Sequence, residues 1–162
     1  NPNLANIEQH ESFYTYTLTI DLDKVGIDGD VKLSNEERVE RLHQLLDIIK
    51  LLNRNIRGRQ ESLAPSFVIG GLYPIANPFF LGRIMLDTKM KRWHINLELL
   101  RDTLDITFAG QAVREYTYLG YVSGLFANED QFSQLLPDRT GSIEMFFKEM
   151  KSQVADYFGV NV

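Results

Sequence analysis

The fold is predicted most directly from one stretch, NRNIRGRQESLAP (residues 53–65), and from what lies on either side of it. This stretch is basic in a chain whose net charge is −5. Its basic residues are Arg54, Arg57 and Arg59. A helical pattern ends as the stretch begins, Gly58 interrupts that helix, and Pro65 prevents it from re-forming. Apolar runs typical of strands flank it at residues 13–22 and 66–73, so we expect a strand, a helix, a basic loop and a strand. This order suits a phosphate backbone held against a sheet.

The composition indicates one globular domain. The chain has 162 residues, of which 44% are apolar and 24% are charged, which is enough for a sizeable core. We assign residues 13–162 to this domain and residues 1–12 to a tail or linker. No apolar run approaches the roughly 18 residues of a membrane helix, so we expect a cytoplasmic protein without membrane contact. The absence of cysteine excludes disulfides and thiolate metal sites.

Charge is segregated along the chain. A net charge of −5 argues mildly against nucleic-acid binding, because such proteins often carry a basic excess. Phosphate neutralisation is local, however, so placement matters more than the sum. Acidic residues gather at 21–30, 36–40 and 128–130, whereas basic residues gather at 54–59 and 89–92. A nucleic-acid surface therefore remains open to this chain.

Hydrophobic spacing predicts the secondary structure. Residues 13–22 alternate apolar and threonine side chains, which indicates a strand, and a capping box at Ser34 and Glu37 opens a helix over residues 35–55. Further strands are expected at residues 66–73, 79–86 and 116–126, and further helices at 97–104, 129–136 and 142–158. This mixture predicts an α+β fold with an antiparallel sheet backed by helices, of the ferredoxin-like or RNA-recognition-like kind.

Four stretches together resemble one protein family. They are FYTYTLTIDLDKVG (13–26), LLNRNIRGRQESLAPSFVIGGLYP (51–74), NPFF (77–80) and YLGYVSGLFANED (118–130). They are similar to the DevR-like backbone subunits of type I CRISPR interference complexes, in the type I-B branch of the seventh Cas family of the RAMP superfamily. Members of this family are longer and have a first strand upstream of the segment matched by Phe13, so the chain resembles a C-terminal part of one.

The resemblance implies a role as well as a modified RNA-recognition fold. It implies a non-catalytic subunit that assembles head to tail along a guide RNA (crRNA) in a CRISPR antiviral interference complex, or Cascade. The implied partners are the guide RNA, target DNA through guide pairing, other copies of the chain and other subunits of the complex.

The arginine stretch is the first candidate RNA contact. A guanidinium binds phosphate through two parallel hydrogen bonds, and neighbouring amides add neutral donors. The residues concerned are Arg54, Asn55, Arg57, Arg59 and Gln60. On composition alone, a solvated helix end that complements the helix dipole explains the same arginines. The resemblance favours the RNA contact.

Two further groups are candidates with open alternatives. A basic turn beside Trp93 suits single-stranded RNA, but it is also typical of a charged hairpin turn with tryptophan in the core. A loop rich in proline and phenylalanine lies either against bases or a neighbouring subunit, or in the core. The residues expected to contact RNA are Lys89, Lys91 and Arg92 in the turn, and Tyr73 and Asn77 in the loop.

The sequence offers little support for a catalytic site or a metal site. His43 and Asp47 stand four residues apart on the expected helix, but two ligands do not make a metal site, and a surface pair is the better interpretation. No nucleophile elbow, phosphate-binding glycine loop or calcium loop is present. We therefore expect no catalysis and no cofactor. The alternative is an RNA endonuclease of the same superfamily that uses His43 or His94 as its acid/base group. A third possibility is a metabolic domain whose arginine stretch binds a small anion.

Overall fold

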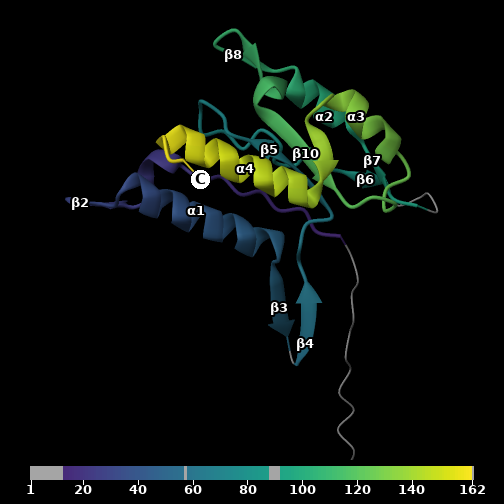
Figure 1. Ribbon diagram of the computed structural model, residues 1–162. Coiled ribbons are helices and arrows are strands. Elements are labelled where there is room, and N and C mark those ends of the chain that lie inside the picture. Colours follow the sequence, from purple (N-terminus) through teal and green to yellow (C-terminus); the bar gives the residue numbers. More distant parts are fainter. Residues whose placement is uncertain (1–12, 57, 88–91, 162) are drawn as a thin grey trace, which may run out of the picture.

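A three-stranded sheet lies at the centre of the computed structural model, which describes residues 13–56, 58–87 and 92–161. Its strands are β5 (Phe67–Gly71), β10 (Thr117–Tyr121) and β11 (Thr140–Ser142), in the order β11-β10-β5 (Figure 1). β10 runs antiparallel to β5, with Leu119 opposite Ile69, and parallel to β11. The α+β class expected from the sequence is confirmed.

Helices α1 (Asn35–Lys50) and α4 (Ile143–Phe158) pack side by side over one face of this sheet (Figure 1). Ser34 and Glu37 form the expected capping box of α1, while Ser142 caps α4 and Gly159 ends it in the left-handed conformation. Apolar side chains from both helices meet those of the sheet. They are Leu46, Ile49, Val68, Tyr118, Phe146, Phe147 and Met150.

The opposite face of the sheet is covered by α2 (Leu97–Leu104) and α3 (Phe132–Leu135). Strand side chains alternate between faces, so those of Phe67, Ile69 and Leu119 belong to this second layer. The best-buried members of the layer are Ile95, Leu100, Leu104, Leu119 and Phe132. The core therefore lies on both sides of the sheet.

Short hairpins connect these layers. They are β1 (Ile27–Asp28) with β2 (Val31–Lys32), β3 (Asn53–Ile56) with β4 (Arg59–Ser62), β6 (Leu86–Asp87) with β7 (His94–Ile95), and β8 (Thr107–Phe108) with β9 (Gln111–Ala112). Single turns of 3₁₀-helix lie at η1 (Leu22–Lys24), η2 (Val113–Tyr116) and η3 (Glu129–Gln131). No helix in the described part of the chain is long and apolar enough to cross a membrane.

Gly71 stands where two backbones approach each other closely. A Cβ atom placed there would lie 1.8 Å from the carbonyl oxygen of Tyr116. No side chain fits in that space, so glycine is required for β5 to pair with β10 at this point.

Three predictions about secondary structure are wrong. Residues 13–21 form no strand, because no partner strand hydrogen-bonds to them within the described residues. α1 ends at Lys50 instead of near residue 55, because residues 53–56 leave the helix and pair with residues 59–62. Residues 79–83 form turns, residues 84 and 85 have no regular secondary structure, and β6 begins only at Leu86. The helices expected at 97–104, 129–136 and 142–158 and the strand at 66–73 are confirmed within a few residues.

Candidate nucleic-acid interface

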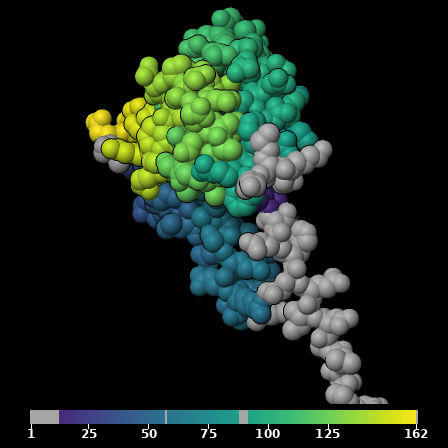
Figure 2. Space-filling view, turned by 90° about the vertical axis from the view of Figure 1, so that its right-hand side faces the viewer, coloured from purple at the N-terminus to yellow at the C-terminus, as the bar shows by residue number. Residues whose placement is uncertain are grey.

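The basic stretch forms a projecting β-hairpin, β3–β4, instead of a helix end followed by a loop. Ile56 pairs with Arg59 next to the turn that contains Gly58, and Gly58 adopts a φ of +78°, which glycine allows without strain. Every described residue of the two strands is exposed. The hairpin stands out from the body beyond the end of α1 (Figure 1), and the side view shows it as a projection below the layered part (Figure 2).

The register divides the hairpin into two faces of different chemistry. Directly paired residues of antiparallel strands point to the same face. One face is neutral and carries amides and a hydroxyl, with Gln60 donating to the side chain of Asn53 at 3.3 Å. The other face carries the charges. The neutral face consists of Asn53, Asn55, Gln60 and Ser62, and the charged face of Arg54, Ile56, Arg59 and Glu61.

The two arginines of the charged face, Arg54 and Arg59, differ in their ion pairing. Arg54 donates from Nε to the Glu61 carboxylate at 2.8 Å, and both side chains are about half exposed. No carboxylate in the described part of the chain pairs with Arg59. Arg57 lies outside the described residues. An exposed ion pair contributes only about 0–1 kcal/mol, so a phosphate can compete with Glu61 for Arg54, whereas Arg59 needs no such exchange. Glu61 was not expected at this site from the sequence, because its pairing with Arg54 depends on the register of β3 with β4.

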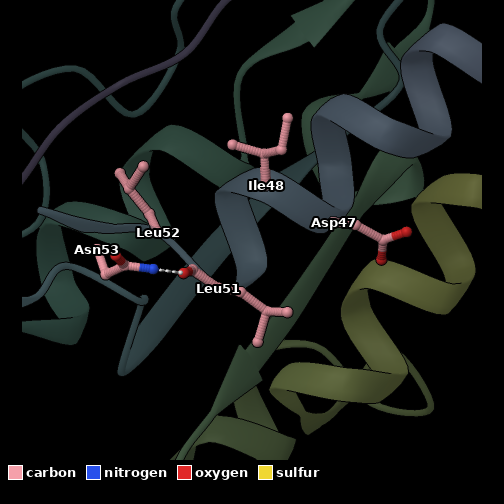
Figure 3. A pocket seen from close by; sticks show the side chains of 5 residues that line it. All are labelled: Asp47, Ile48, Leu51, Leu52 and Asn53. Atoms are coloured by element: carbon pink, nitrogen blue, oxygen red, sulfur yellow. Dashed lines mark hydrogen bonds between the residues drawn. The ribbon is translucent and has the colours of Figure 1, made fainter.

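A shallow hollow of about 330 Å³ lies at the base of the hairpin (Figure 3). Its lining is mainly apolar. The lining residues are Asp47, Ile48, Leu51, Leu52 and Asn53, and the side-chain amide of Asn53 donates to the backbone carbonyl of Leu51 at 3.0 Å. A hydrogen bond from Lys151 holds the pKa of the Asp47 carboxyl below its usual value, with further help from Lys50. The Asp47 carboxylate is already engaged by Lys50 and Lys151 and most of the lining is apolar, so the hollow suits an apolar group.

The candidates in the proline-rich loop have two different environments. The hydroxyl of Tyr73 lies 2.9 Å from that of Thr117, and its ring meets Phe79 edge-on at 4.9 Å between centroids. Burial raises the pKa of Tyr73 to about 12. Asn77 is exposed in the loop. Tyr73 therefore packs with the core, and only Asn77 presents its side chain to solvent.

The second basic group lies elsewhere on the molecule. Arg92, at the β6–β7 hairpin, donates to the backbone carbonyl of Gly124 at 2.7 Å, while Trp93 is half-buried with its ring against Phe13. Lys89 and Lys91 lie outside the described residues. Figure 1 places the β6–β7 hairpin apart from the β3–β4 hairpin. The structure therefore does not bring Arg92 together with Arg54 and Arg59.

His43 and His94, the two histidines that the structure describes, do not stand in a cluster of metal ligands. Nε2 of His43 lies 3.0 Å from the backbone carbonyl oxygen of Lys151, between α1 and α4, and Asp47 is engaged by lysines instead. His94 belongs to β7 on a different part of the fold. No group of three or more histidine, aspartate or glutamate side chains within the described ranges is placed to hold a metal ion.

The first half of the chain matches a known protein family. Residues 1–80 match a family model described as "CRISPR-associated negative auto-regulator DevR/Csa2". The chain is a DevR-like CRISPR-associated protein. No curated protein and no solved structure matches it. The DevR-like segment contains α1, the whole β3–β4 hairpin and β5, together with Tyr73 and Asn77, whereas Arg92 lies outside it.

Proposed function

We propose that the chain is a guide-RNA-binding backbone subunit of a CRISPR antiviral interference complex, and that it catalyses no reaction. The observation that carries this proposal is the DevR/Csa2 match over residues 1–80, which contains the complete β3–β4 hairpin. In this role the subunit binds guide RNA, presents it for pairing with target DNA and contacts further copies head to tail. Such a heterologous contact builds an open filament unless other subunits end it.

The chemistry of the β3–β4 hairpin supports backbone contact with RNA. Arg59 offers an exposed guanidinium, Arg54 offers a second one held only by a surface ion pair, and the neutral face adds amide donors such as that of Gln60. Arginine and amide groups are suited to phosphate and sugar oxygens. Contacts of this kind position an RNA strand without reading its sequence. We therefore expect affinity for single-stranded RNA that varies little with base composition.

A double charge reversal in the basic stretch tests the proposal. The variant carries Arg57→Glu and Arg59→Glu, and fluorescence anisotropy with a labelled single-stranded RNA measures its affinity across a salt series. Each phosphate contact contributes about −0.7 to the slope of log K against log salt for a single strand. Losing two contacts should make the slope shallower by roughly 1.4 and weaken the affinity at least tenfold.

The matched control reverses two arginines away from the hairpin. Arg83 and Arg101 are exposed, so Arg83→Glu with Arg101→Glu makes the same change in net charge. If both double variants weaken binding equally, only overall charge matters and the hairpin assignment is wrong.

A cleavage assay tests the non-catalytic role, in which the same labelled RNA is followed on a gel. Shortening of the RNA that stops when His43 and His94 are both replaced would contradict the non-catalytic role.

A further inference from the structure

Glu61 differs from the rest of the β3–β4 hairpin because it is acidic. It is the only acidic residue in the basic stretch at residues 53–65. The register places it directly opposite Arg54, and Nε of Arg54 lies 2.8 Å from its carboxylate. Nearly half of each side chain is exposed, so the ion pair is open to water and to ions. An RNA strand that binds the hairpin therefore meets Arg54 with its charge already compensated.

The Glu61 carboxylate also lies near Arg59. The two residues are two positions apart on β4, so their side chains point to the same face and their Cα atoms are about 7 Å apart. Coulomb interactions act over this distance, although water and salt weaken them. Glu61 therefore opposes phosphate at both described arginines of the hairpin, at Arg54 through the ion pair and at Arg59 through space.

A structural role for the ion pair is the alternative. A two-stranded hairpin is only marginally stable by itself, and every described residue of β3 and β4 is exposed. An exposed ion pair stabilises a fold weakly, however, and four pairs of facing residues hold the two strands together. Loss of the Glu61 charge should therefore cost little order and should mainly remove repulsion of phosphate.

We propose that Glu61 limits the affinity of the hairpin for RNA by competing with phosphate for Arg54. This inference rests on the proposed guide-RNA binding. Phosphate gains the Arg54 guanidinium only as Glu61 releases it, whereas Arg59 has no carboxylate partner among the described residues and needs no such exchange. Glu61 is thus a positioning residue, which acts on RNA through Arg54.

Fluorescence anisotropy with labelled single-stranded RNA and nuclease-treated chain measures the effect of Glu61→Gln. Glutamine keeps the length of the side chain and an oxygen that accepts a hydrogen bond from Arg54, so the variant removes the charge and little else. We expect it to bind RNA about three- to tenfold more tightly than the parent chain. The slope of log K against log salt should become steeper by about 0.7, because one more arginine releases a counterion to phosphate.

The matched control is Glu36→Gln, which makes the same change in net charge. Glu36 is exposed in the first turn of α1, and the hairpin lies beyond the other end of this helix, roughly 20 Å away (Figure 1). We expect the affinity of this variant to change less than twofold. An equal gain in both variants would mean that only overall charge matters, which overturns the inference.

A double-mutant cycle shows whether Glu61 acts through Arg54. Arg54→Gln removes the other half of the ion pair, so adding Glu61→Gln to it should raise the affinity less than twofold. A gain of the same size with and without Arg54 overturns the competition, and so does a Glu61→Gln variant that binds no more tightly than the parent chain. A parent chain that binds no RNA overturns the proposed function as well, so the two failures are distinguishable.

Discussion

Replacing Arg38 should destabilise the fold more than the loss of any surface arginine. Arg38 retains only 6% of its accessible surface, yet no carboxylate in the described part of the chain pairs with it. Its guanidinium donates to three backbone carbonyls, those of Leu22 and Asp23 at 2.9 and 3.1 Å and that of Val25 at 2.7 Å. It also lies 4.4 Å from the ring centroid of Phe158. The side chain thus ties residues 22–25 to α1 and α4.

The magnitude follows from these contacts. A hydrogen bond to a charged group contributes about 1.5–3 kcal/mol, and a cation over an aromatic ring adds about 1 kcal/mol. Losing the three bonds and the ring contact is offset in part, because the burial of a guanidinium no longer costs desolvation. We expect Arg38→Met, which keeps the apolar stem, to lower the free energy of unfolding by about 3–5 kcal/mol.

Urea unfolding followed by circular dichroism measures this change. The matched control is Arg41→Met, because Arg41 lies on the same helix but is exposed, and we expect less than about 0.5 kcal/mol there. The two variants should share the m-value of the parent chain, so that the midpoints report stability alone. If Arg38→Met unfolds at the same urea concentration as Arg41→Met, the contacts of Arg38 with the backbone carbonyls do not stabilise the fold, and the prediction is wrong.

Two further predictions concern Gly120 in β10 and Tyr73 in the loop after β5. Gly120→Ala should lower the free energy of unfolding by about 1–3 kcal/mol in the same urea assay, because the added Cβ would lie 2.8 Å from Cβ of Phe146. An unchanged midpoint would show that α4 shifts away from the new methyl group without loss of stability. Since the pKa of Tyr73 is raised to about 12, its contribution is complete below pH 10, the unfolded value, and is lost as the pH rises toward 12. The parent chain should therefore lose about 2–3 kcal/mol more of its free energy of unfolding between pH 10 and 12 than the Tyr73→Phe variant does. Parallel plots of unfolding free energy against pH for the two proteins would contradict this.

The elements that the sequence predicted best are those with local signals. α2 was expected from Asn96 and the spacing of the residues after it, and the structure places the Asn96 side chain on the amide of Glu98. α4 likewise begins at its serine cap, Ser142. A helix satisfies its hydrogen bonds within its own segment, so its pattern and caps are sufficient to find it.

The strands and the candidate site depended on contacts between distant residues. The alternation at residues 13–22 is typical of a strand, but a strand also needs a partner, and the described chain supplies none. The arginines were found from their number in an acidic chain. The register of β3 with β4 places Arg54 beside Glu61, whereas Arg59 has no carboxylate partner among the described residues, and no composition or spacing reveals this difference.

By itself, the sequence determined the α+β class, the capped helices, the likeness to the DevR-like family and the position of a basic stretch. Only the tertiary structure decided that this stretch is an exposed hairpin with two faces, that Tyr73 belongs to the core and that Arg38 is buried against backbone carbonyls. The physical reason is the range of the interactions. Helix periodicity and caps act within a few residues, whereas strand pairing, burial and the desolvation of a charge depend on what the rest of the chain places beside each residue.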